Sequence, residues 1–244
     1  KNSNLTDKKG ITFDKNVKMS DVINTLPFKL TKAQLRVLQE IDENMESEKS
    51  MNRLLQGDVG SGKTVVAMIS AYKAVKSGYQ AAILAPTAIL ATQHMVNFEK
   101  MLNQFDIKCE LLISGISKKK KEDILERLKN GEIDILIGTQ MVVKGHHFPK
   151  VTLVGVIAAD GSLNQDDYRA NERTFQILTQ VAGRAGRENL PGKVIIQTYN
   201  PENFSIQDAQ KQNYQEFYET EITLRKQLKY PPFCDIIIIG FNSL

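Results

Sequence analysis

Short apolar runs alternate with amphipathic helical patterns along most of this chain, and this alternation constrains the fold more than any other feature. It is typical of βαβ units, in which successive strands lie parallel and helices cover the sheet. We expect strands at residues 52–57, 81–87, 109–115, 133–139 and 151–159, and helices at 30–45, from 63, from 89, at 118–132 and at 217–230. In the first of these helices Thr31 is the expected N-cap, and Leu35, Leu38, Ile41 and Met45 recur at helical spacing. The last helix places Phe217, Leu224 and Leu228 on one side, which we interpret as packing. The sequence therefore predicts an α/β fold with a mostly parallel sheet and flanking helices.

A phosphate-binding loop follows the first expected strand. The residues GDVGSGKT fit the pattern G-x-x-x-x-G-K-[ST] between a strand and a helix. Glycines let backbone N–H groups converge on phosphate oxygens, and the positive end of the following helix adds to the attraction. A glycine-rich turn with a solvent-facing lysine is the plainer alternative. We expect ATP contacts from Gly57, Asp58, Val59, Gly60, Ser61, Gly62, Lys63 and Thr64.

Two residues of this loop have expected chemical roles. Lys63 should reach the β and γ phosphates, and Thr64 should offer its hydroxyl to Mg²⁺. ATP and Mg²⁺ are thus the expected cofactors.

Composition limits the class of protein. The 244 residues are 41% hydrophobic, which is enough for a packed core, and the net charge of +4 permits a nucleic-acid partner without implying one. The two cysteines have no partners at metal-ligand spacing. Because the apolar runs are short and no signal-peptide pattern opens the chain, we expect a cytoplasmic protein. It begins at Lys1 and stops after a strand-like run, so we expect a fragment of a longer protein.

The first half of the chain resembles the first motor lobe of the RecG branch-migration helicases of superfamily 2. The resemblance covers residues 26–140 and rests on LPFKLTKAQLRVLQEI, MNRLLQGDVGSGKT, APTAILATQH, LLISG and DILIGT. It implies a RecA-like P-loop fold in which Gln34 lies in the segment that reads adenine. It also implies that Thr87, Gln93 and Ser114 line the path of the DNA strand, although each is equally well explained as a strand-end cap or a helix-surface residue.

The second half resembles the second motor lobe of the PriA replication-restart helicases. GTQMVVKGHHFP corresponds to motif V and QVAGRAGR to motif VI in residues 135–244. Gly138 and Thr139 fit both patterns, so we interpret the chain as a chimera joined there, and we place Thr139 on the DNA side. Lys144 is either a phosphate contact or a plain surface lysine. The expected division is a linker or arm at 1–25, a motor domain at 26–200 and a C-terminal extension at 201–244.

The acidic pair that such motors use is missing. The resemblance calls for adjacent Asp and Glu at the end of a strand near the phosphate loop, but the chain's one Asp-Glu pair, Asp42-Glu43, lies in a helical pattern. The run VTLVGVIAAD ends in Asp160, which we therefore consider as a substitute magnesium ligand, against the alternative that it opens a polar turn. Gly161 follows it, so no glutamate is present to orient water.

The resemblance also implies that Arg184 and Arg187 of motif VI reach the γ-phosphate across a cleft between two lobes. If the two halves merge into one lobe, these arginines could act only on a neighbouring molecule, and the protein would then be a homo-oligomer. The sequence therefore predicts an ATP-dependent DNA motor acting on single strands or forks. The alternatives are a module that binds nucleotide without hydrolysis, or a recombined chain that retains only the fold.

Overall fold

The structure, a computed structural model, describes residues 11–49, 51–56, 62–139, 148, 150–163, 167–184 and 192–236. Within these residues six strands form one fully parallel sheet in the order β1-β6-β5-β2-β4-β3. The predicted α/β fold with a parallel sheet is confirmed. The strands are β1 (Met51–Gln56), β2 (Gln80–Leu84), β3 (Cys109–Leu112), β4 (Ile135–Gly138), β5 (Val151–Val156) and β6 (Lys193–Thr198).

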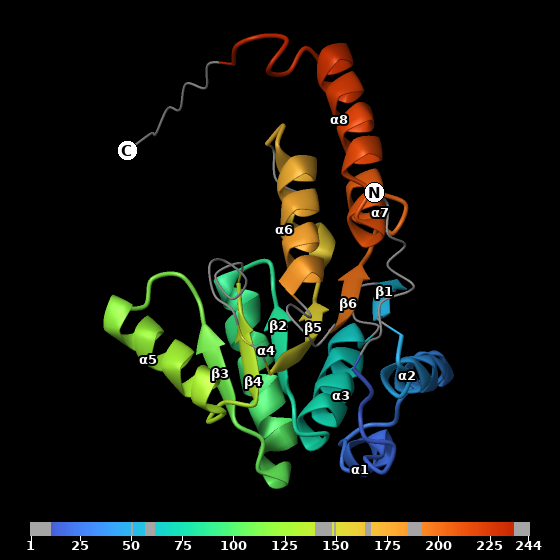
Figure 1. The fold of residues 1–244 in the computed structure, drawn as a ribbon, viewed down its shortest axis with the longest axis vertical. Coiled ribbons are helices and arrows are strands. Elements are labelled where there is room, and N and C mark those ends of the chain that lie inside the picture. The colour runs from blue at the N-terminus through green and yellow to red at the C-terminus, as the bar shows by residue number, and fades with distance from the viewer. Residues whose placement is uncertain are drawn as a thin grey trace.

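Both faces of the sheet are covered by helices (Figure 1). One core contains residues from α1 (Met19–Ile23), α2 (Lys32–Met45), α3 (Lys63–Lys76) and α4 (Ala88–Leu102). The other contains residues from α5 (Lys118–Asn130), α6 (Ala170–Arg184), α7 (Phe204–Lys211) and α8 (Tyr214–Leu228). Successive strand residues point to opposite faces: Ile83 of β2 lies in the first core and Leu84 in the second.

Hydrogen bonds between neighbouring residues fix where α2 begins. Thr31 is the N-cap, as predicted: its hydroxyl accepts a hydrogen bond from the Gln34 amide at 3.2 Å, and the Gln34 side chain accepts one from the Thr31 amide at 2.8 Å. Leu38, Ile41 and Met45 are buried, as expected. Leu35 belongs to the same helix but is 45% exposed, because at 3.6 residues per turn it is rotated off the centre of the buried stripe.

The expected strand 151–159 is present as β5, but its position in the sheet needs a correction. One interpretation of this segment has the strand end at Asp160 near the phosphate loop. The strand ends at Val156, four residues before Asp160, and β6 lies between β1 and β5. No strand was predicted at β6, which enters the sheet from far along the chain and separates β5 from β1.

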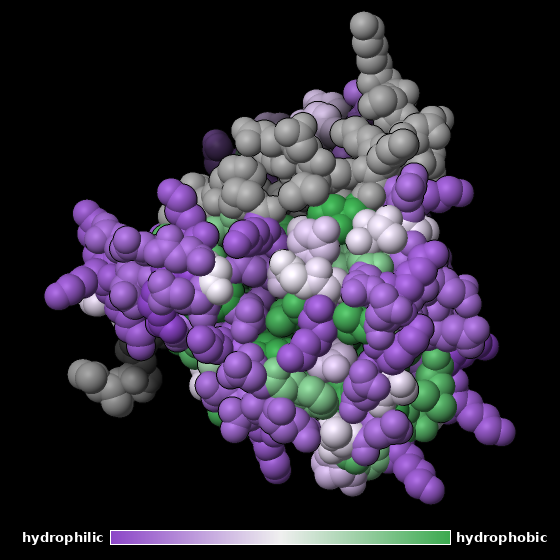
Figure 2. All heavy atoms as spheres, turned by 60° about the horizontal axis from the view of Figure 1, so that its bottom comes forward, coloured by the Kyte–Doolittle hydropathy of each residue, from purple (hydrophilic) through white to green (hydrophobic). Residues whose placement is uncertain are grey.

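Helices α6 and α8 project together beyond the sheet in Figure 1. The predicted packing of α8 is only partly right: Phe217 is 4% exposed, but Leu228 is 60% exposed at the projecting end of the helix. Figure 2 shows the end of the molecule that is lowest in Figure 1, where hydrophilic side chains predominate and hydrophobic ones emerge in small groups. Among the described helices, none combines the length and the apolar character needed to span a membrane.

Candidate nucleotide-binding site

The carboxyl ends of the parallel strands meet at one edge of the sheet, and several predicted site residues follow them. Thr87 comes after β2, Thr139 after β4 and Asp160 after β5. The phosphate loop follows β1 and ends where α3 begins at Lys63. In open parallel sheets, ligands bind in the crevice outside the carboxyl ends of the strands. The predicted residues are therefore brought to the edge where such a site is expected.

Gly62 forms the junction between the phosphate loop and α3. It is the N-cap of α3 with φ of +72°, in the left-handed region that favours glycine. A Cβ added to Gly62 would lie 2.3 Å from the Gln34 side-chain nitrogen, so this amide group packs directly against the end of the loop. The structure thus brings Gln34, predicted from a distant segment, to the phosphate loop.

Lys63 is nearly buried at the start of α3, with 8% of its surface exposed. Its Nζ lies 4.3 Å from the centroid of the Tyr199 ring, within the range of a cation–π interaction. Tyr199 follows β6 directly and is 40% exposed. Tyr199 is a site residue that was not predicted; the apolar run KVIIQT that precedes it is the signal that would have placed it at a strand end.

Asp160 contacts the loop that follows β6. It sits in the 3-10 turn η4 (Ala159–Ser162) and is 5% exposed. Its Oδ1 accepts a hydrogen bond from the Tyr199 backbone amide at 2.9 Å. The carboxylate therefore ties the turn after β5 to the loop after β6. Asp160 thus lies in a short turn after β5, and its proposed magnesium role stays a prediction.

Gly161 occupies the position where an adjacent glutamate would stand. A Cβ built on it would lie 2.7 Å from Cβ and 2.9 Å from Cγ of Pro86, the residue two positions after β2. Contacts this short require one of the two segments to move. A longer side chain at this position is therefore opposed by packing.

The Asp42-Glu43 pair lies in α2, as the sequence predicted. Asp42 pairs with Lys73 of α3, whose side chain is fully buried and also contacts Glu46 at 2.6 Å. Asp42 thus holds two helices together.

The sequence model of the DEAD/DEAH box helicases matches residues 31–166, which is more than half of the 244-residue chain. The chain belongs to the DEAD/DEAH box helicase family. This match begins at the N-cap of α2 and runs through the phosphate loop to the turn after β5.

Relatives of this helicase domain come from the two groups that the sequence resembles. The ATP-dependent DNA helicase RecG of Bacillus subtilis is 48% identical over 140 residues, which are 57% of this chain and 20% of that protein. The replication restart protein PriA of the same organism is 49% identical over 118 residues, 48% of this chain and 15% of that protein. The chain thus spans only a small part of the curated relatives it matches.

Solved helicase structures share the fold. RecG bound to a three-way DNA junction aligns with 86% of this chain and 26% of that chain, with a TM-score of 0.62 and 32% identity. Dbp5 of S. cerevisiae aligns with 80% of this chain and 48% of its own, with a TM-score of 0.59 and 19% identity, a likeness of fold alone. The RecA-like fold expected from the resemblance is confirmed.

Three of the four described residues predicted for the DNA side of the helicase domain lie after neighbouring strands. Leu84 of β2 and Leu112 of β3 both pair with Gly138 of β4, so these strand ends are level. Thr87 is exposed and caps α4, where its hydroxyl accepts a hydrogen bond from the Leu90 amide at 3.3 Å. Ser114 is exposed in the turn after β3, and Thr139 is half-buried after β4.

The fourth residue, Gln93, is exposed on α4, whereas the neighbouring His94 is 8% exposed. Burial lowers the pKa of His94, which keeps its imidazole neutral at physiological pH. The two residues thus face opposite environments, and Gln93 is the one available to a ligand.

Several predicted site residues fall outside the described part of the helicase domain. They are Gly57, Asp58, Val59, Gly60, Ser61, Lys144 and Arg187. The backbone of Arg184 ends α6, but its side chain is not described.

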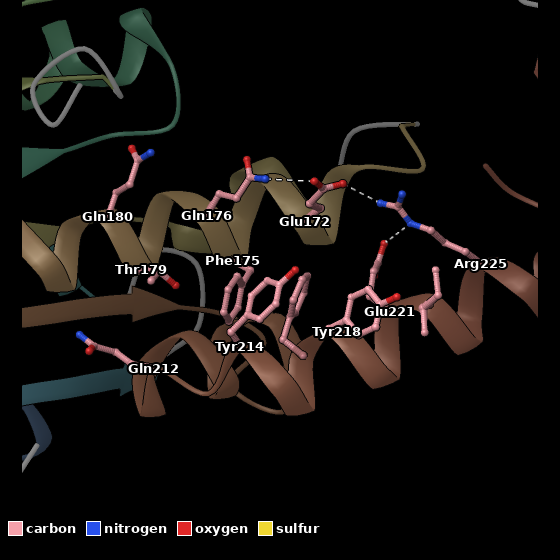
Figure 3. A pocket seen from close by; sticks show the side chains of 12 residues that line it. Glu172, Phe175, Gln176, Thr179, Gln180, Gln212, Tyr214, Tyr218, Glu221 and Arg225 are labelled. Atoms are coloured by element: carbon pink, nitrogen blue, oxygen red, sulfur yellow. Dashed lines mark hydrogen bonds and ion pairs between the residues drawn. The ribbon is translucent and has the colours of Figure 1, made fainter. Parts of the chain in front are cut away.

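A cavity of about 620 Å³ lies between α6 and α8 of the helicase domain and shares no lining residue with the phosphate-loop site. Figure 3 shows Phe175, Tyr214 and Tyr218 gathered in it, and Arg225 held by Glu172 and Glu221 at 2.8 Å each. These two carboxylates outnumber the one guanidinium, so the lining does not favour phosphate groups. The phosphate-loop edge remains the better candidate for a nucleotide.

Proposed function

We propose that this chain is the ATP-binding part of a DNA motor that couples ATP hydrolysis to movement along a single strand or fork. The observation that carries this proposal is the meeting of Gln34, Gly62 and Lys63 at the carboxyl end of β1. Gln34 comes from α2, before the strand, yet it packs on the last residue of the phosphate loop. An amide beside a phosphate-binding helix start suits a ligand with both a base and phosphates.

Thr64 and Asp160 are the residues proposed to hold Mg²⁺. Hydroxyl and carboxylate oxygens are ligands that this ion accepts, usually together with water and substrate phosphates. One oxygen of Asp160 accepts the Tyr199 amide, and the second retains acceptor capacity. The described residues contain no group of three or more histidine, cysteine or acidic side chains that could hold a metal, so the nucleotide itself would have to supply ligands. The ion would neutralise charge on the phosphates.

DNA is the proposed partner, at the edge that carries Thr87, Ser114 and Thr139. Their hydroxyls suit contacts to phosphate oxygens, which position a strand without reading its sequence. The exposed Gln93 and the undescribed Lys144 complete the proposed set. Relatives named as DNA helicases and a RecG structure with a DNA junction support this partner.

The proposed domain division keeps residues 1–25 as an arm, 26–200 as the motor domain and 201–244 as an extension, with a RecG-like part joined to a PriA-like part near Gly138. The join would lie at the end of β4, which pairs with β2 and β3 in register. In this proposal Arg184 and Arg187 act on a neighbouring molecule, because the described strands form one sheet. Phosphate release per molecule should then rise with protein concentration, and a constant specific rate would contradict action between molecules.

A second function, nucleotide binding without hydrolysis, is favoured by one observation. Pro86 closes the space beside Gly161 in which a water-orienting glutamate would stand. Binding requires the phosphate loop alone, whereas turnover requires a group that aims the attacking water. The two functions therefore make different predictions for the same protein.

The deciding experiment measures binding of a fluorescent ATP analogue and release of phosphate, with and without single-stranded DNA. The motor predicts binding and DNA-stimulated release, and binding without such release would contradict it in favour of the second function. Lys63→Ala should lower affinity for the analogue by at least tenfold, because the variant loses a charge-assisted contact to phosphate, roughly 1.5–3 kcal/mol. Lys76→Ala, which removes an exposed lysine at the other end of α3, is the matched control and should leave binding unchanged.

A further inference from the structure

Tyr199 connects the two charged groups proposed for the nucleotide site. Its ring contacts the Lys63 ammonium at 4.3 Å, and its backbone amide donates a hydrogen bond to Asp160 at 2.9 Å. Lys63 is 8% exposed and Asp160 is 5% exposed, so both contacts lie in surroundings from which water is largely excluded. Tyr199 itself is 40% exposed, which leaves room for its ring to move.

From this arrangement we infer that the Tyr199 ring is a latch on Lys63, which holds the ammonium away from phosphate and so sets the affinity of the site for nucleotide. The inference rests on the proposed function, because it concerns regulation of the same site. A lysine ammonium cannot be centred on a ring and donate all its N–H groups to phosphate oxygens at once. Phosphate oxygens and the ring therefore compete for the N–H groups of Lys63.

The strength of this competition follows from the energy of the contact. A cation–π pair contributes roughly 0.5 kcal/mol when exposed and about 2 kcal/mol when desolvated. Converted at about 1.4 kcal/mol per tenfold, the range corresponds to an affinity reduced roughly 2- to 30-fold. The low exposure of Lys63 places this pair toward the upper part of the range.

Tyr199 makes its two contacts through different parts of the residue: the ring contacts Lys63, and the backbone amide contacts Asp160. The hydrogen bond to Asp160 comes from the Tyr199 backbone, so it survives when the side chain is changed. Substitutions at Tyr199 can therefore remove the ring from Lys63 while the loop after β6 stays attached to the turn after β5. Thr198, which is fully buried, keeps this loop anchored through its hydroxyl, which accepts a hydrogen bond from the Asn200 amide at 3.0 Å.

The test compares Tyr199→Leu and Tyr199→Gln, which lack the ring, with Tyr199→Phe, which keeps it. Both ring-free variants should bind the fluorescent ATP analogue roughly 2- to 30-fold more tightly than the original protein, and Tyr199→Phe should bind within about twofold of it. In a Lys63→Met background, where no ammonium is present, Tyr199→Leu should leave affinity unchanged. Equal or weaker binding by both ring-free variants, in proteins with unchanged melting temperatures, would overturn the inference.

A second readout needs no nucleotide. Acylation of Lys63 by an amine-reactive reagent, followed by mass spectrometry of the peptide, should be faster in both ring-free variants and unchanged in Tyr199→Phe. Lys76, exposed at the far end of the same helix, supplies the internal reference. If no variant bound the analogue, the proposed function would fail, and the acylation rate alone would decide whether Tyr199 holds Lys63. An unchanged acylation rate in both ring-free variants would contradict the inference that the Tyr199 ring holds Lys63.

Discussion

At the scale of single residues, the close packing of Gly161 against Pro86 limits which side chains the turn after β5 can accommodate. Restoring an acidic pair with Gly161→Glu should not create DNA-stimulated hydrolysis, because the new side chain would meet Pro86 within 3 Å. The variant should instead lose roughly 1–3 kcal/mol of unfolding free energy through overpacking. Chemical denaturation together with phosphate release tests both parts. A variant of unchanged stability with new hydrolysis would show that the turn accommodates the glutamate.

Lys193, the first residue of β6, gives a prediction about pH. Its side chain is fully buried, and its Nζ donates hydrogen bonds to the backbone carbonyls of Asn44, Ser47 and Lys49. Burial lowers the pKa of Lys193 to about 8, below the value of about 10.4 expected in the unfolded chain. Between these two values the unfolded state binds more protons, so the free energy of unfolding rises with pH.

The comparison with Lys193→Met isolates this contribution. The unfolding free energy of the original protein minus that of the variant should be constant below about pH 7 and grow by roughly 1.4 kcal/mol per pH unit above about pH 8. Urea titrations at pH 6, 7, 8, 9 and 10 measure it, and effects of other titrating groups cancel in the difference. A difference that stays flat to pH 10 would mean that Lys193 keeps an ordinary pKa in the folded protein.

At the scale of elements, the sequence predicted the helices and strands that are determined by a few neighbouring residues. The Thr31 cap, the phosphate loop before α3 and the apolar runs of β1 to β5 each carry their information within a few residues. The position of β5 two strands away from β1 depends instead on β6, which inserts between them from far along the chain. The contact between Tyr199 and Lys63 follows from that insertion, so no spacing in the sequence could have predicted it.

Two neighbouring aromatic residues of α8, Phe217 and Tyr218, differ strongly in burial and therefore allow a controlled comparison of substitutions. Phe217 is 4% exposed and stacks on Phe175 at 4.0 Å between ring centroids, whereas Tyr218 is 48% exposed. Phe217→Ala should cost roughly 3–5 kcal/mol of unfolding free energy, because it removes a buried ring and enlarges the cavity between α8 and α6. Tyr218→Ala, one residue along, should cost no more than about 1 kcal/mol. Equal losses, measured by denaturation, would contradict the view that α8 is fixed through Phe217.

At the scale of the whole molecule, the sheet interleaves the two halves that resemble different motors. Strands β1, β2, β3 and β4 lie in the part of the chain proposed to be RecG-like, while β5 and β6 lie in the part proposed to be PriA-like. The order β1-β6-β5-β2-β4-β3 places both later strands inside the sheet, between β1 and β2. In the described sheet β1 pairs only with β6. The strand that leads to the phosphate loop is therefore held by the other half of the chain.

This interleaving predicts that neither half folds by itself. A fragment of residues 11–139 would leave β1 without its partner strand and would leave the edge of β2 that pairs with β5 without hydrogen-bond partners. Residues 11–236 should unfold in one cooperative thermal transition, whereas residues 11–139 and 150–236, each alone, should show none. Circular dichroism and calorimetry on the three chains make the comparison. A fragment of residues 11–139 that melted cooperatively and bound the ATP analogue would show that the first half is an independent lobe, and that β6 and β5 were added to a sheet already complete.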